Sequence, residues 1–129
     1  MRGYFVNVRD CEHGPVEASG LEDYYRLIGC RCIDIAVRDV GGRPYNIVLD
    51  DEGLLVDSPV VSAYMGNEPA LAGNLIFFGL DESTFDVASL SDDDVENIKN
   101  HMRPVVGVLN GCLEIWPVVM MDEVASRLY

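Results

Sequence analysis

Positive charge is the scarcest feature of this sequence. Residues 44–98 contain twelve carboxylates and no lysine or arginine, and Lys99 is the single lysine of the chain. A protein that neutralises nucleic-acid phosphates needs a basic stripe, and this sequence offers none. We therefore expect no direct nucleic-acid binding. A net charge of −13 with this distribution instead favours a basic partner.

Long hydrophobic runs are also missing. The longest, at residues 75–78 and 117–121, are far too short to span a bilayer. Residues 1–5 carry one arginine, with no apolar stretch of signal-peptide length behind it. We therefore expect a cytoplasmic protein that does not bind membranes, with its four cysteines in the reduced state.

Catalytic motifs are absent as well. The chain has two histidines, His13 and His101, and no spacing pairs either of them with a nucleophile. It also lacks a glycine-rich phosphate loop. We therefore expect a protein that is not an enzyme and that uses no cofactor.

A group of soft metal ligands provides the main alternative to a function in binding a basic partner. Cys11, His13, Cys30 and Cys32 together offer four nitrogen or sulfur donors, the number that tetrahedral zinc requires. Their Cys-x-His and Cys-x-Cys spacings differ from the roughly two to four intervening residues of common zinc sites. A small-ligand or metal-binding domain with hydrolytic activity, centred on His13, Cys30 and Cys32, is the alternative function. A second alternative is an uncharacterised soluble domain with a structural role.

Hydrophobic periodicity predicts a sheet-rich domain. Alternating residues predict strands at 3–9, 15–18, 30–40, 45–49 and 54–56. The continuous apolar run at 75–78 predicts a central strand that is buried on both faces. Asn110-Gly111 predicts a hairpin over residues 105–116, and a short helix is expected from about residue 121. Residues 57–72 give no clear signal.

Two helices have recognisable starts. Ser19 and Glu22 have the spacing of a capping box, and Gly29 can end the helix that follows. Ser91 precedes three consecutive aspartates, which favour the N-terminus of a second helix through its dipole. Val95 and Ile98 are expected to face inward from that helix.

These elements predict a single α+β domain over residues 1–129. We expect an antiparallel or mixed sheet of roughly five to seven strands, two packed helices and a C-terminal β-hairpin. The expected core residues are Phe5, Leu27, Ile33, Ile35, Ile47, Val48, Leu75, Phe77, Ile98, Val108 and Ile115.

The order of these signals resembles a family of small proteins from phages and mobile elements, catalogued as a domain of unknown function, family 3846. The matching stretches are residues 21–29, 46–55, 73–79 and 89–98. They cover most of residues 21–98 and leave 103–129 as a C-terminal hairpin and tail extension. The chain departs from the pattern at Pro59, which is followed by two valines instead of an Asn-Arg pair. The resemblance implies a phage or mobile-element origin and an accessory role in host takeover or defence evasion.

An acidic segment around the second helix is the predicted partner-binding surface. Its members lie close together in sequence without an intervening cation, whereas acids needed only for solubility can be spread out. The predicted residues are Asp81, Glu82, Asp86, Asp92, Asp93, Asp94 and Glu96. We expect Asp92 to help cap the helix. We also expect neutralisation of Asp93, Asp94 and Glu96 to leave the stability unchanged or higher.

The expected partner is a basic host protein. An acidic surface can enter the basic cleft of a nucleic-acid-binding enzyme as a nucleic-acid mimic, which would make this protein an anti-defence inhibitor. The oligomeric state is left open by the sequence.

Overall fold

The computed structural model describes residues 1–8, 10, 12–52, 61–64, 71–109 and 112–120. Its larger sheet has six strands, all paired antiparallel, in the order β2-β1-β7-β4-β3, with β8 pairing to β7. These strands are β1 (Arg2–Asn7), β2 (Glu12–Glu17), β3 (Ile33–Val40), β4 (Arg43–Asp50), β7 (Leu75–Leu80) and β8 (Val87–Ala88).

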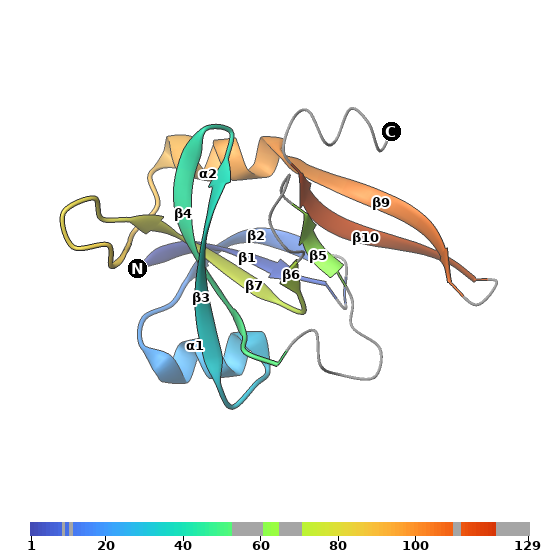
Figure 1. Ribbon diagram of the computed structural model, residues 1–129, viewed down its shortest axis with the longest axis horizontal. Coiled ribbons are helices and arrows are strands. Elements are labelled where there is room, and N and C mark those ends of the chain that lie inside the picture. The colour runs from blue at the N-terminus through green and yellow to red at the C-terminus, as the bar shows by residue number, and fades with distance from the viewer. Residues whose placement is uncertain (9, 11, 53–60, 65–70, 110–111, 121–129) are drawn as a thin grey trace.

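A second, four-stranded sheet lies beside the first (Figure 1). Its order is β6 (Leu71–Ala72), β5 (Val61–Tyr64), β10 (Cys112–Met120) and β9 (Met102–Leu109). β5 and β10 run parallel, and β9 and β10 form the C-terminal hairpin that the sequence predicted. β5 and β6 arise from the stretch that gave no clear signal. The predicted strand at 54–56 and the predicted helix from residue 121 lie outside the described residues.

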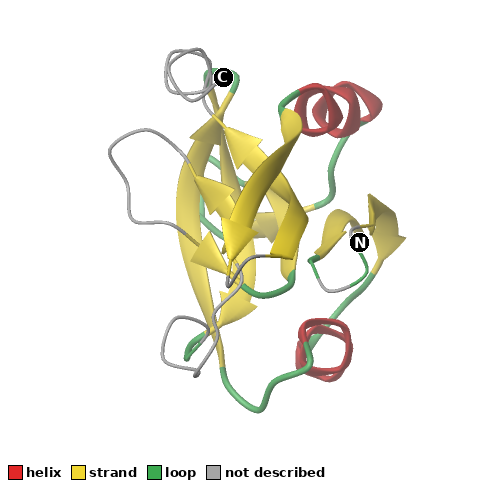
Figure 2. Cartoon of the chain, turned by 90° about the vertical axis from the view of Figure 1, so that its right-hand side faces the viewer, coloured by secondary structure: helices red, strands yellow, loops and turns green. Residues whose placement is uncertain are grey.

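The two helices, α1 (Leu21–Ile28) and α2 (Asp92–Asn100), cover opposite faces of the larger sheet (Figures 1 and 2). Side chains alternate across each strand, so Ile47 and Phe77 pack in the cluster with α2, whereas Val48 packs in the cluster with α1. The predicted α+β architecture is therefore confirmed. None of the helices in the described ranges is long and apolar enough to cross a membrane.

Central strand β7 is buried on both faces, as its apolar run predicted, because residues 75–79 are all buried. Of the predicted core, the fully buried residues are Ile47, Val48, Leu75, Phe77 and Ile98. Phe5, Leu27 and Ile33 are partly buried against the α1 cluster. The side chains of Val108 and Ile115 lie outside the described part of the chain.

The prediction for Ile35 was wrong, because its side chain is 47% exposed. β3 is an edge strand of the larger sheet, and the hydrophobic cluster around α1 includes Ile33 of this strand but not Ile35. An apolar side chain at an edge position therefore stays in contact with water, even though its alternation pattern matches that of a core residue.

The prediction of a Ser19 capping box was also wrong. Gly20 is the N-cap of α1 and provides no side chain, while the Ser19 backbone N–H donates to the Asp23 carboxylate at 2.9 Å. Gly29 ends this helix in the left-handed conformation, with φ of 79°, as predicted. The prediction of Ser91 as the start of α2 is confirmed.

Candidate acidic binding site

The loop between β7 and β8 is organised by one carboxylate. Asp81 Oδ1 accepts hydrogen bonds from the Ser83 backbone N–H (2.9 Å), the Ser83 hydroxyl (2.7 Å) and the Thr84 N–H (3.3 Å). Hydrogen bonds from Ser83, with the Thr84 N–H adding to them, lower the pKa of Asp81 below its usual value. Asp81 is therefore a structural residue of the loop as well as a source of negative charge.

Two backbone hydrogen bonds close the same loop. The Asp81 N–H donates to the Asp86 carbonyl at 2.9 Å, and the Phe85 N–H donates to the Asp81 carbonyl at 2.7 Å. In this closed loop Phe85 has φ of 60°, and it is the one described non-glycine residue with positive φ. Its side chain is 73% exposed. A strained backbone that presents a large aromatic side chain to solvent is a feature associated with functional loops.

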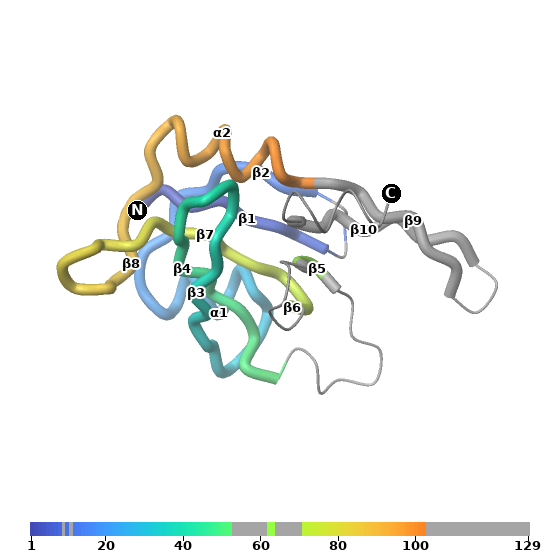
Figure 3. The backbone as a smooth tube through the Cα atoms, turned by 45° about the horizontal axis from the view of Figure 1, so that its top comes forward, coloured from blue at the N-terminus to red at the C-terminus, as the bar shows by residue number. Residues whose placement is uncertain are grey.

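Phe85 was missed by the sequence-based reasoning. It follows Ser83-Thr84 in a polar segment, so an isolated aromatic there carries no periodic signal. Figures 1 and 3 show this loop and the N-terminal end of α2 at the same end of the molecule. The predicted acidic loop and acidic helix are therefore neighbouring parts of one region.

The N-terminus of α2 has a complete capping box, but its acidic member is Asp94. The Asp94 N–H donates to Ser91 Oγ at 3.1 Å, and Asp94 Oδ2 accepts from the Ser91 N–H (3.1 Å) and hydroxyl (2.9 Å). The expectation that Asp92 caps the helix was wrong. Asp92 is exposed and forms an ion pair with Arg2.

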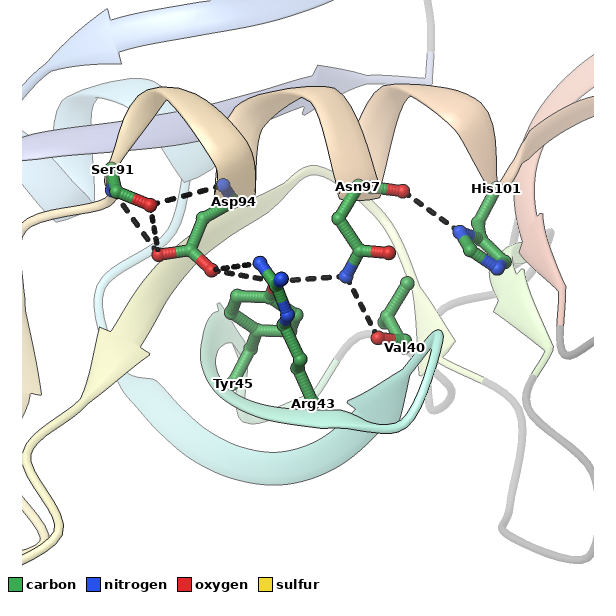
Figure 4. A network of polar contacts seen from close by, with 7 residues as sticks. All are labelled: Val40, Arg43, Tyr45, Ser91, Asp94, Asn97 and His101. Atoms are coloured by element: carbon green, nitrogen blue, oxygen red, sulfur yellow. Dashed lines mark hydrogen bonds and ion pairs between the residues drawn. The ribbon is translucent and has the colours of Figure 1, made fainter.

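Asp94 also connects α2 to the β3–β4 hairpin (Figure 4). Its Oδ1 accepts from the Tyr45 hydroxyl at 3.0 Å and from Arg43 Nη1 at 3.3 Å. Asn97 extends the connection, because its Nδ2 donates to the Tyr45 oxygen and to the Val40 carbonyl, both at 2.9 Å. These contacts join residues that are 49 to 57 positions apart in the sequence.

The electrostatics of the network follow from these contacts. Partial burial is the largest single influence on the Asp94 carboxylate and opposes its ionisation. The hydrogen bonds from Ser91, Tyr45 and Arg43 together outweigh it and lower the pKa of Asp94. Burial is the main cause of the raised pKa of Tyr45, so its hydroxyl remains a donor.

No cation intervenes among these acids in sequence, but two arginines reach the acidic region from elsewhere in the chain. Arg2 and Arg43, both distant in sequence, pair with Asp92 and Asp94. Of the seven predicted acids, three have side chains that form hydrogen bonds or ion pairs: Asp81, Asp92 and Asp94. The other four are exposed and have no ion pair within the described ranges of the chain. They are Glu82, Asp86, Asp93 and Glu96. We call these four residues and Phe85 the acidic end.

The soft metal ligands are not brought together by the fold. His13 lies on β2 and Cys30 and Cys32 lie between α1 and β3, so they are at opposite edges of the larger sheet. Neighbouring strands are about 4.8 Å apart, and three strands separate β2 from β3. Cys11 is outside the described residues. Within the described ranges, no group of three or more His, Cys, Asp or Glu side chains is placed to hold a metal ion.

His13 has a structural contact instead. Its Nδ1 lies 2.5 Å from the hydroxyl of Tyr4, a residue whose side chain is buried in the core. Burial is the main cause of the lowered pKa of His13, and the positive charge of Lys99 adds to it. A neutral imidazole can accept a hydrogen bond from this hydroxyl.

A shallow cleft of about 200 Å³ runs along the β1–β2 hairpin, and its lining includes Phe5, His13 and Val16. This volume is below the roughly 300–1,000 Å³ that is typical of small-ligand pockets. The cleft includes His13 but neither Cys30 nor Cys32, so it joins only one of the three residues of the small-ligand alternative.

The model of the family described as a domain of unknown function (DUF3846) matches residues 1–103. The match ends near the start of β9, so all of β10 lies beyond it. No curated protein and no solved structure matches the chain. Because the family model covers most of its length, the chain belongs to the DUF3846 family.

Proposed function

We propose that this protein is a non-enzymatic accessory protein that binds a basic host protein through its acidic end. The proposal rests mainly on the exposure and backbone conformation of Phe85. Its side chain is 73% exposed at a positive φ, in a loop closed by Asp81. A positive φ destabilises a bulky residue, and exposure of its ring recovers no burial energy, so partner binding explains why an aromatic residue stands there.

The chemistry around Phe85 defines the partner. Glu82 and Asp86 flank the ring in sequence, and both are exposed. Arginine and lysine side chains pack on aromatic faces and pair with carboxylates, so a surface rich in these residues complements the acidic end. A basic surface with an apolar pocket fits best, with the ring in the pocket and the carboxylates at its rim.

A nucleic-acid-binding enzyme of the host cytoplasm is the partner that we propose. The basic cleft that holds a polyanion also attracts an acidic protein, and occupation of that cleft blocks the enzyme. The sequence resemblance implies a phage or mobile-element origin, and such an element benefits when a host defence enzyme is blocked. The protein would act as an anti-defence inhibitor that mimics nucleic acid.

The experiment compares two variants that each lose four charges. The test variant neutralises the acidic end through Glu82→Gln, Asp86→Asn, Asp93→Asn and Glu96→Gln. The control neutralises four exposed acids elsewhere through Glu12→Gln, Glu22→Gln, Asp51→Asn and Glu52→Gln. Each immobilised protein is used to capture basic proteins from a host lysate at about 0.15 M salt, where the Debye length is about 8 Å.

We expect the parent and the control to retain the same basic protein and the test variant to lose it. Higher salt should release the protein from the parent, because exposed charge pairs are screened. Equal retention by all three proteins would contradict a role for the acidic end.

Phe85→Gly separates binding from stability. Glycine tolerates a φ of 60°, so this variant should be as stable as the parent or more stable by about 0–1 kcal/mol. Binding should nevertheless be lost, because the aromatic anchor is removed. Thermal unfolding and the capture assay measure the two effects. Retained binding by Phe85→Gly would remove the main support for the proposal.

A further inference from the structure

β3 is an edge strand of the larger sheet. In the described part of the chain, β3 pairs only with β4. The two strands are joined by the two-residue turn Gly41-Gly42, next to the Val40–Arg43 pair. In such a hairpin the pair next to the turn exchanges backbone hydrogen bonds, and every second pair after it does the same.

This alternation decides which backbone groups point outward. Val40, Arg38, Ala36 and Asp34 direct their N–H and C=O groups to β4. The intervening residues, Ile33, Ile35, Val37 and Asp39, direct theirs away from the sheet. β3 therefore presents the donors and acceptors that an added strand requires.

Two of these outward groups are occupied by side chains of β3 itself. The Ile35 N–H donates to Asp34 Oδ1 at 2.8 Å, and the Val37 carbonyl accepts from Arg38 Nη1 at 3.0 Å. Arg38 Nε has no hydrogen-bond partner in the described structure. The Asp34 carboxylate and the Arg38 guanidinium can therefore leave these backbone groups and form an ion pair with another chain. The backbone groups of an added strand can then take their place at the Ile35 N–H and the Val37 carbonyl.

The side chains beside this edge are apolar on one face. Ile35 is 47% exposed and Val37 is 50% exposed, and both lie on the face that α1 covers elsewhere. Exposed apolar residues on a long edge strand are typical of a strand-pairing surface.

The sequence of β3 is complementary to itself. If a second copy of β3 lies antiparallel with a two-fold axis at Ala36, Asp34 faces the partner's Arg38. By symmetry, Arg38 faces the partner's Asp34, which gives two opposite-charge pairs. On the other face Ile35 packs against the partner's Val37. The outward backbone groups of both strands then meet in the alternation that an antiparallel ladder requires.

Neighbouring registers lose this complementarity. An axis at Ile35 places Asp34 opposite the partner's Ala36, and an axis at Val37 places Asp34 opposite the partner's Val40. An axis at Asp34 or at Arg38 places two like charges opposite each other, which is destabilising. We propose that this protein forms a symmetric dimer through antiparallel pairing of β3 strands centred on Ala36, which extends the larger sheet across two copies.

The dimer is weak, because edge pairing buries a small surface and each copy carries a charge of −13. Its residues are separate from the acidic end, so the dimer and the proposed function can fail independently. Sedimentation equilibrium over a concentration series at about 0.15 M salt measures the association constant.

Charge reversal is the decisive comparison. Asp34→Arg and Arg38→Asp each place like charges opposite each other at both pairs. Each should weaken association roughly ten- to a hundred-fold. The double variant Asp34→Arg/Arg38→Asp recreates opposite charges and should restore association close to that of the parent. Asp93→Arg is the matched control for charge reversal and should not weaken the dimer.

A second variant tests the apolar face without altering these pairs. Val37→Lys should abolish the dimer, because it places charges on both sides of the two-fold axis. Circular dichroism of each variant confirms that it is folded. A parent that stays monomeric at all concentrations overturns the proposal. A dimer that is unaffected by the single reversals, or that the double variant fails to restore, overturns it as well.

Discussion

Replacement of Asp94 by alanine is the sharpest test of the polar network between α2 and the β3–β4 hairpin. The carboxylate completes the capping box with Ser91 and accepts hydrogen bonds from Tyr45 and Arg43. Loss of a helix cap costs about 0.5–2 kcal/mol. Removal of the acceptor of a buried hydroxyl costs about 1–3 kcal/mol, and Tyr45 is 1% exposed.

The ion pair with Arg43 adds little to this sum. Its two side chains are 52% and 24% exposed, and pairs of this kind contribute about 0–1 kcal/mol. Since the Tyr45 oxygen keeps its bond from Asn97, we expect a total loss of about 2–4 kcal/mol for Asp94→Ala. In a domain of this size that loss lowers the melting temperature by roughly 6–15 °C.

Asp93→Ala is the matched control, because Asp93 is adjacent and exposed but its side chain has no hydrogen bond or ion pair within the described residues. Its effect should stay within about 1 kcal/mol, the limit of an exposed charge–dipole interaction. Urea unfolding measures both variants. If Asp94→Ala unfolds within about 0.5 kcal/mol of the parent, the contacts in Figure 4 do not hold the fold together.

The same carboxylate predicts a pH dependence. Its pKa is lower in the folded protein than in the unfolded chain, so its contribution is complete above the unfolded value of about 4. It is lost as the pH falls through the folded value. The difference in stability between parent and Asp94→Ala should therefore be full near pH 7 and shrink below about pH 4. A difference that stays constant on acidification would contradict the lowered pKa.

Two further predictions concern the hairpin turn and the Tyr4–His13 contact. Gly41→Ala should destabilise the protein by about 1–3 kcal/mol, because φ is 58° and a Cβ atom would collide with the Asn97 amide. At Gly42 a Cβ atom meets no neighbour, so Gly42→Ala should cost only backbone strain, about 1 kcal/mol. Equal losses in urea unfolding would refute the collision. The pKa of His13 is lowered on folding, so acidification from about pH 7 to pH 5 protonates the unfolded chain first and lowers stability. His13→Asn should flatten this part of the stability profile, and an unchanged slope would show that another group titrates there.

Local signals predicted most elements of the fold. Ser91 before three aspartates predicted the start of α2, and Gly29 predicted the end of α1, because caps depend on a few adjacent residues. The uninterrupted apolar run of β7 predicted its burial on both faces. Periodicity could not predict that Ile35 is exposed, because exposure depends on the position of β3 in the strand order.

The candidate site was predicted only in part, because its contacts also depend on how distant parts of the chain come together. Sequence proximity indicated that the acidic loop lies near the N-terminal end of α2, but it could not show that Arg43 and Tyr45 reach Asp94 from about 50 residues away. The expectation that neutralisation of Asp93, Asp94 and Glu96 leaves the stability unchanged conflicts with these contacts of Asp94, and Asp94→Ala tests it. Phe85 has no local signal, because its importance depends on a φ value and an exposed fraction.

Photo-crosslinking from position 85 tests the central claim, that the acidic end contacts a basic host protein, most directly. Phe85→p-benzoylphenylalanine keeps an aromatic ring at the site, and Glu52→p-benzoylphenylalanine is the control at another exposed position. After irradiation in host cells, mass spectrometry identifies the adducts. We predict a specific adduct with a basic protein from position 85, absent from position 52 and lost when Glu82, Asp86, Asp93 and Glu96 are neutralised. No adduct from position 85, or the same adducts from both positions, would contradict the account.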